Sequence, residues 1–191
     1  MQLAGGALPV SLSDALRSLR ELEFIEATVA VGPCVDGDVQ CVSIASALLW
    51  AAAEGFEAAV CATGPGIVGT GSPFGHGGVA AADAVNACSA LGGFAVLAVR
   101  ASDGDTRERH RGVSHHTRAI LQLCTDGVVA AWPEGSEAPS WLEPREQVDV
   151  SGWHEASAAL PLSHMGRGPG EDPLFFAAAF AAGRVARARM V

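Results

Sequence analysis

Short apolar runs alternate along this chain with segments of helical periodicity, and glycine-rich loops separate them. We expect strands over 27–31, 94–99 and 128–132. Each is a β-branched or continuously apolar run that ends at a glycine, an arginine or a proline. Strands that are apolar on both faces are typical of a parallel sheet covered on both sides. The fold class expected is therefore α/β: three-layer, with a mostly parallel sheet and helices on both faces, Rossmann-like or doubly wound.

The other expected elements complete this alternation. Helices are expected over 12–22, 40–54, 79–91 and 114–124 and from residue 173, a further strand over 57–63, and a short edge strand over 148–150. A chain of 191 residues without an internal repeat fits one domain, so residues 1–191 are interpreted as a single α/β domain.

Composition excludes several classes of function. The net charge of −9 argues against a nucleic-acid partner. The chain has no lysine, which excludes a Walker P-loop and Schiff-base chemistry. The longest apolar run, around 41–53, is too short and mixed for a membrane span. Five cysteines without a Cys-x-x-Cys pair, and no basic residue before Arg17, indicate a cytoplasmic protein with reduced thiols.

Three unusual loops, over 32–38, 64–78 and 100–112, each follow an expected strand. Loops that follow parallel strands emerge at the carboxyl edge of the sheet, where open α/β sheets bind ligands. We therefore expect the three loops to lie at one edge and to form a ligand site there.

The loop over 64–78 matches the dinucleotide-binding pattern G-x-G-x-x-G in form. Pro65 removes a backbone donor and no helix begins at once, so a nicotinamide or flavin role is disfavoured and the cofactor stays unknown. The alternatives are a backbone that cradles a small anion such as phosphate, and a packing loop or subunit contact. The candidate ligand-binding residues are Gly64, Gly66, Gly69, Thr70 and Gly71.

Residues 106–116 contain three arginines and three histidines next to two aspartates. Arginines this dense repel one another unless an anion lies among them. The anion is either a ligand carboxylate or phosphate, or the acidic side chains of the segment itself in a structural salt-bridge network. For the ligand reading, the candidate binding residues are Arg107, Arg109, Arg111 and Asp103.

The same segment supplies the candidate catalytic residues His110, His115, His116 and Ser114. Ser114 lacks the glycines of a nucleophile elbow and is expected to cap the following helix. A histidine in that first turn stays neutral and serves as an acid–base group or a metal ligand. Adjacent residues point about 100° apart on a helix, so His115 and His116 can both face one ion only if the helix begins irregularly. A metal set of His110, one neighbouring histidine and Asp103 or Asp105 matches no zinc signature.

Several longer motifs carry a family resemblance. Residues 5–9 read Gly-Gly-Ala-Leu-Pro, 64–71 read Gly-Pro-Gly-Ile-Val-Gly-Thr-Gly, and 107–117 read Arg-Glu-Arg-His-Arg-Gly-Val-Ser-His-His-Thr. With 164–168, His-Met-Gly-Arg-Gly, they resemble the C-terminal part of the bacterial domain-of-unknown-function family DUF3866. The family has no assigned activity, so the resemblance implies no reaction. Its members more often have Phe-Gly-Phe-Ser-Gly where this chain has 74–78, so the resemblance implies no shared catalytic role for His76.

Two functions of different classes follow from these observations. The first is a domain, enzymatic or not, that binds a small anionic metabolite through the glycine loop and the arginine–histidine segment. The second is a non-catalytic homo-oligomeric assembly or regulatory domain, a homodimer for example, in which the arginine, aspartate and histidine side chains form an internal network. Metal-dependent hydrolysis is a third, weaker interpretation.

Overall fold

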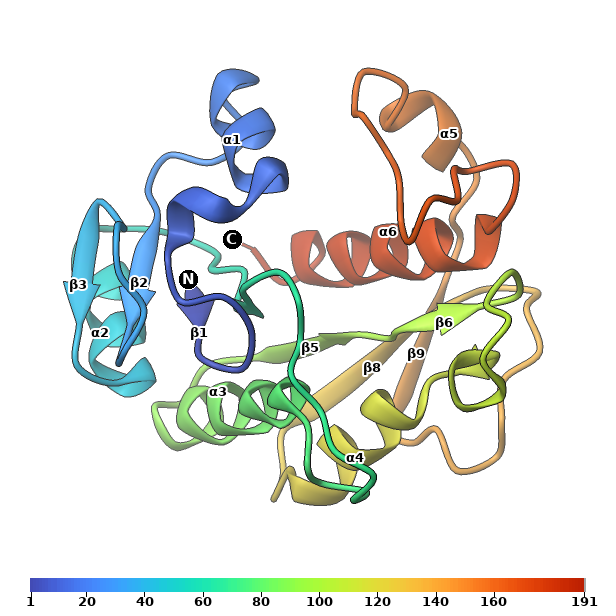
Figure 1. Cartoon of the computed structure of the whole chain (residues 1–191), viewed down its shortest axis with the longest axis horizontal. Helices are drawn as coiled ribbons and strands as arrows, with labels where there is room; N and C mark the ends of the chain where they lie inside the picture. Colours follow the sequence, from blue (N-terminus) through green and yellow to red (C-terminus); the bar gives the residue numbers. More distant parts are fainter. Residues whose placement is uncertain (191) are drawn as a thin grey trace. The chain divides into compact units, whose positions relative to one another are not determined.

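The chain is an α/β protein built on parallel sheets, and the computed structural model describes residues 1–190 (Figure 1). Its contacts divide it into two compact units. The first unit comprises Met1–Gly93 and Ala119–Asp126, and the second comprises Phe94–Arg118 and the described residues from Gly127 onward. Each unit thus contains two separate stretches of sequence. The expected α/β fold on parallel sheets is confirmed, and the single domain over 1–191 stays a prediction.

The first unit contains a four-stranded parallel sheet in the order β3-β2-β1-β4. The strands are short: β1 (Gln2–Leu3), β2 (Val29–Val31), β3 (Val39–Cys41) and β4 (Ala62–Thr63). All of β2 is buried, because it pairs on both sides and apolar side chains cover it. Leu3, Val29 and Val31 form one core with Ala47 and Ala84 of the helices described next.

Serine caps set the starts of two helices of the first unit. Its helical segments are η1 (Val10–Leu12), α1 (Asp14–Glu21), α2 (Ile44–Ala53), η2 (Gly77–Val79) and α3 (Ala80–Ala90). Ser13 accepts a hydrogen bond from the Leu16 amide at the start of α1. Ser43 and Ser46 form a capping box at the start of α2, which packs on β2, β3 and α3.

The second unit contains a three-stranded parallel sheet in the order β5-β8-β9. Its strands are β5 (Ala95–Ala98), β8 (Val128–Pro133) and β9 (Arg145–Val148). A separate antiparallel hairpin follows β5 and consists of β6 (Ala101–Ser102) and β7 (Gly112–Val113). The segment between the two hairpin strands contains the 3₁₀ turn η3 (Glu108–His110).

Helix α6 (Pro173–Arg187) packs on β5, β8 and β9, as Figure 1 shows. Its Ala181 and Val185 are fully buried against Ala131 of β8, because small side chains let the helix approach the sheet closely. Two further helices, α4 (His115–Leu123) and the short α5 (Trp153–Ala156), complete the chain's helices among the described residues. None of the helices in residues 1–190 is long and apolar enough to cross a lipid bilayer.

Several expected element boundaries were wrong, and short strands account for most of the differences. The helix expected over 40–54 begins only at Ile44, because Val39–Cys41 pairs with β2 as a strand. The strand expected over 57–63 is limited to Ala62–Thr63, and the edge strand expected over 148–150 lies earlier, at Arg145–Val148. Strands of two or three residues are too short to show a period in the sequence.

The expectation that three loops share one sheet edge was wrong for the third loop. Residues 32–38 and 64–78 follow β2 and β4, which belong to the same sheet. Residues 100–112 follow β5, which belongs to the other sheet. The alternation of strands and helices does not reveal which strands pair, since pairing depends on contacts far apart in the sequence.

Candidate functional site

The arginine-rich segment of the second unit is a loop that a short hairpin closes. Ala101 pairs with Val113 and Ser102 with Gly112, so residues 103–111 project between β6 and β7. Gly112 has φ +63°, a left-handed backbone that favours glycine at the end of the loop. The pairing brings the two ends of the loop together, and the side chains beside those ends form the candidate site.

Asp172, directly before α6, fixes the start of this loop. Its Oδ2 accepts hydrogen bonds from Ser102 Oγ at 2.6 Å and from Arg167 Nε at 3.0 Å. Its Oδ1 accepts from the backbone amides of Asp103 at 3.1 Å and Gly104 at 3.3 Å. Burial alone would raise the pKa of Asp172, but these hydrogen bonds lower it by more, so the net shift is downward. The carboxylate is therefore ionised, and each of its oxygens accepts two hydrogen bonds.

Asp105 lies among three arginines. Arg107 binds it through two atoms, with Nε 2.9 Å from Oδ1 and Nη2 2.8 Å from Oδ2. The Arg107 guanidinium holds the pKa of Asp105 well below its usual range. The Nη2 atoms of Arg100 and Arg167 lie 3.5 and 3.6 Å from the same Oδ2, beyond a good hydrogen bond. Asp105 and Asp172 are thus two buried carboxylates beside three guanidinium groups. The net charge of these five side chains is positive.

Arg100 connects this aspartate to the histidines. Its Nη1 contacts His110 Nδ1 and donates a hydrogen bond to Ser114 Oγ at 3.0 Å. Its Nη2 lies 3.4 Å from Nε2 of His164, whose ring stacks on Phe175 with centroids 3.8 Å apart. Burial and the charges of Arg100 and Arg167 lower the pKa of His164. One guanidinium therefore holds two imidazoles and a carboxylate in place.

His110 and Ser114 form the inner part of the site. Ser114 Oγ lies 2.8 Å from His110 Nδ1 and accepts a hydrogen bond from the His116 amide at 3.2 Å, so Ser114 also caps α4 as expected. Burial, then the charges of Arg100 and Arg107, lower the pKa of His110 to about 4, so this imidazole is neutral at physiological pH. Ser114 has no exposed surface and His110 only 3%, so both side chains are buried.

His115 and His116 lie at the start of α4, where both are partly exposed. The rings of His110, His115 and His116 are in mutual contact, with centroids 4.3 to 5.0 Å apart. One ring nitrogen of His115 lies within 4.8 Å of one ring nitrogen of His116. The two rings therefore lie close together, although adjacent residues of a regular helix point about 100° apart.

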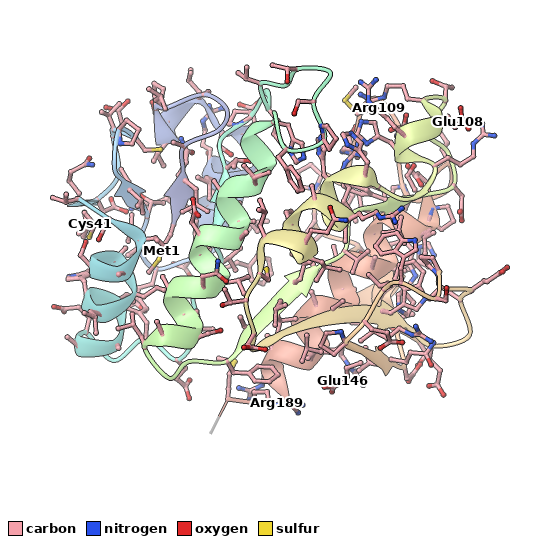
Figure 2. The ribbon with its side chains drawn as sticks, turned by 90° about the horizontal axis from the view of Figure 1, so that it is seen from below. Met1, Cys41, Glu108, Arg109, Glu146 and Arg189 are labelled. Carbon is pink, nitrogen blue, oxygen red and sulfur yellow. The ribbon has the colours of Figure 1, made fainter. Side chains whose placement is uncertain are left out.

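The remaining candidates of this segment lie farther out. Arg109, Arg111 and Asp103 are exposed, and Figure 2 shows Arg109 with Glu108 on the loop. Arg109 Nε still reaches His110 Nε2 at 3.3 Å. Within residues 1–190, His110 with a neighbouring histidine and Asp103 or Asp105 does not form a cluster close enough to hold one ion, and Asp105 gives both oxygens to Arg107.

The glycine loop lies in the first unit, where several of its glycines are required by packing. A Cβ added at Gly64 would lie 2.1 Å from Ala7 O, and one at Gly77 would lie 1.8 Å from Gly5 O. The Ala7 amide also donates to Pro65 O at 2.8 Å. The loops after the neighbouring strands β1 and β4 thus lie backbone to backbone, which only glycine permits.

The outer part of this loop is open. Gly66 and Gly71 are exposed and have no neighbour within 4 Å of an added Cβ, whereas a Cβ added at Gly69 would lie 3.4 Å from the His76 side chain. Thr70 Oγ1 donates to Gly75 O at 3.1 Å, so this hydroxyl holds a turn. The glycine loop and the arginine–histidine residues belong to different units, and each is a candidate in its own right.

Three important residues of the site escaped the sequence interpretation. Arg100 entered only as the first residue of the loop over 100–112, and Ser102 and Asp172 were not among the candidates. A charged residue directly after an apolar strand, as Arg100 is after 94–99, is the signal that points to a site at the strand end.

A comparison with protein-family models finds one that matches residues 1–183, described as a protein of unknown function, DUF3866. No curated protein and no solved structure matches the chain. The match covers both the glycine loop and the arginine–histidine segment, so both are features within the matched region.

Proposed function

Because the chain belongs to the DUF3866 family, whose function is unknown, we propose a function from the chain's own geometry: binding of a small anionic metabolite. The site is the arginine network of the second unit, and the ligand carries a phosphate or a carboxylate. Arginine suits both groups, because its planar guanidinium matches two of their oxygens at once. Arg107, Arg109 and Arg111 were the arginines expected from the sequence, and Arg100 and Arg167 join them.

One observation carries the proposal. The Nη2 atoms of Arg100 and Arg167 approach the same oxygen of Asp105, but Arg107 already occupies that carboxylate. Arg167 Nη2 is buried and makes no hydrogen bond within residues 1–190. A buried donor without an acceptor costs about 1–3 kcal/mol. A ligand oxygen between the two guanidinium groups removes that cost.

The histidines beside this position give a bound ligand an acid–base partner. His110 is neutral and is in contact with Arg100, and His115 and His116 are the partly exposed members of the cluster. An enzymatic reaction, if the ligand is a substrate, uses these imidazoles, with Ser114 holding His110 and Arg100. The open glycines of the first unit, Gly66 and Gly71, are a separate candidate for contact with a ligand.

A rival function follows from the four hydrogen bonds on Asp172. In a homo-oligomeric assembly domain, the same network serves only to hold the loop, and no ligand is needed. A cytoplasmic location, a homo-oligomer and the lack of a nucleic-acid partner stay predictions.

Calorimetric titration and thermal shift with orthophosphate, pyrophosphate and citrate test the proposal. An anion at a hundred times its dissociation constant stabilises the folded state by about 2.7 kcal/mol. Arg100→Lys and Arg167→Lys keep the charge but lose the planar fork, and each weakens binding at least about tenfold, or 1.4 kcal/mol. Arg189→Lys is the matched control, since Arg189 lies elsewhere in the same unit, where its Nη2 donates to Glu146 Oε2 at 2.7 Å (Figure 2).

The phosphate and citrate arms separate the two ligand chemistries. Equal affinity in the wild type and in both lysine variants contradicts a site at these arginines. No stabilisation by any of the three anions, with a folded protein, supports the rival assembly function, which light scattering then tests through the oligomeric state.

A further inference from the structure

Three imidazole rings in mutual contact lie at the start of α4, and their arrangement suits a second role besides acid–base chemistry on a bound anion. His110 is held by Arg100 and Ser114. His115 and His116 contact its ring and each other, with centroids 4.9, 5.0 and 4.3 Å apart. Both are partly exposed, so an ion from solvent can reach them.

The geometry of the pair suits one metal ion. One ring nitrogen of His115 lies within 4.8 Å of one of His116. Zinc–nitrogen bonds are about 2.0–2.1 Å long, so two nitrogens on one tetrahedral ion lie about 3.3–3.4 Å apart. Rotation of the two side chains has to close at most about 1.5 Å.

The local structure at the start of α4 fixes the positions of these two imidazoles. Ser114 fixes this turn by accepting the His116 amide hydrogen. The His110 ring, held at Nδ1, packs against both other rings and keeps them side by side.

We propose that His115 and His116 together bind one divalent ion of the zinc class, with the other positions of the ion open to water or to an anionic ligand. Imidazole nitrogen suits zinc, copper and nickel, whereas magnesium and calcium prefer oxygen ligands. Open positions are typical of catalytic metal sites rather than structural ones. The proposal does not depend on the anion site. The two sites are neighbours, because His110 contacts both Arg100 and the rings of His115 and His116.

Zinc titration of the chelator-treated full chain tests the inference. We expect one equivalent of Zn²⁺ to bind, and His115→Ala or His116→Ala to weaken binding at least about tenfold. His154→Ala, which removes a histidine stacked on Trp153 in the same unit, is the matched control and leaves binding unchanged. Cobalt(II) absorption distinguishes imidazole ligands from the five thiols of the chain.

Nitrogen-15 NMR of the wild-type imidazoles keeps the test decisive if a variant fails to fold. Zinc addition should shift one ring nitrogen of His115 and one of His116 and leave the nitrogens of His154 in place. The inference is overturned if neither histidine shifts, if both alanine variants bind zinc as the wild type does, or if cobalt shows thiolate ligation. The anion titrations in metal-free buffer report separately on the proposed function.

Discussion

At Asp172, one buried carboxylate joins two segments of the second unit that lie far apart in the sequence. Ser102, Asp103 and Gly104 donate to it from the start of the arginine-rich loop, and Arg167 donates from the segment before α6. The Ser102 hydroxyl is fully buried and the other three donors are partly buried, so loss of the carboxylate would remove an acceptor from all four. The position of Arg167, and with it the proposed anion site, depends on this residue.

Replacing Asp172 with Asn tests that dependence. The substitution keeps the shape but removes the charge that Arg167 and the amides face, and breaking a buried charge pair costs about 3 kcal/mol. Urea unfolding at pH 7 measures the change. The control is Glu171→Gln at the exposed neighbouring position, which should alter the free energy of unfolding by less than about 0.5 kcal/mol. An Asp172→Asn variant as stable as this control would show that the network contributes little.

The pH dependence of the same variant gives an independent prediction. Because the pKa of Asp172 is lowered in the folded state, its contribution is full above the unfolded-state pKa of about 3.9. The contribution is lost as the pH falls from there through the lower folded-state pKa. The difference in free energy of unfolding between wild type and Asp172→Asn should therefore be constant from pH 7 to about pH 5 and shrink below about pH 4. Unfolding curves at pH 6, 4 and 3 measure it, and a difference that does not shrink contradicts the assigned cause.

At the scale of elements, the loops after β1 and β4 interlock through glycines. Gly5 and Gly77 approach each other so closely that a side chain on either would overlap the other's backbone. Gly64 is closed in the same way by the backbone at Ala7. The motif 5–9 and the two ends of the glycine loop are thus explained by packing within the first unit, whereas Gly66 and Gly71 are not.

Alanine substitutions at Gly77 and Gly71 separate these two roles. Gly77→Ala forces the loops apart and should destabilise the protein by about 1–3 kcal/mol. Gly71→Ala meets nothing within 4 Å and has no left-handed φ, so it should be neutral or stabilise by about 0.4–1 kcal/mol. Thermal unfolding of both variants measures the effects. Equal melting temperatures for the two would contradict the close approach of Gly5 and Gly77.

At the scale of the whole molecule, neither compact unit is one continuous stretch of chain. The first unit takes up Ala119–Asp126 after the second has begun at Phe94. The first unit needs Ala119–Asp126, which follows the second unit's first segment, and the second unit needs the residues from Gly127 onward, which follow the first unit's second segment. Neither unit can therefore complete its fold from one continuous stretch of chain. This favours the single domain expected from the sequence, and we predict that both units unfold in one transition.

Tryptophan positions allow that prediction to be measured. Trp50 lies in the first unit, while Trp132, Trp141 and Trp153 lie in the second. In a Trp50→Phe variant, fluorescence reports on the second unit alone and far-ultraviolet circular dichroism on the whole chain. Coincident urea transitions indicate one cooperative domain. A fluorescence midpoint that differs from the dichroism midpoint would show two domains.

Sequence patterns were sufficient where an element is long or strongly periodic. The expected helices over 79–91 and 114–124 and the strand over 94–99 agree with α3, α4 and β5 to within one residue at each end. Strands such as Gln2–Leu3 were missed because two residues show no alternation, and they exist only through pairing with β2 and β4. The short strands also determine that the parallel strands form two sheets instead of one.

The sequence by itself determined the α/β class, the cap at Ser114 and the grouping of Arg107, His110, His115 and His116, because periodicity, capping and dense charge act between residues a few positions apart. Only the tertiary structure decided that Arg100, Arg167 and Asp172 complete the network and that the rings of His115 and His116 converge. A buried charge takes whichever partner the packing of distant segments brings within reach, and that choice leaves no local pattern in the chain.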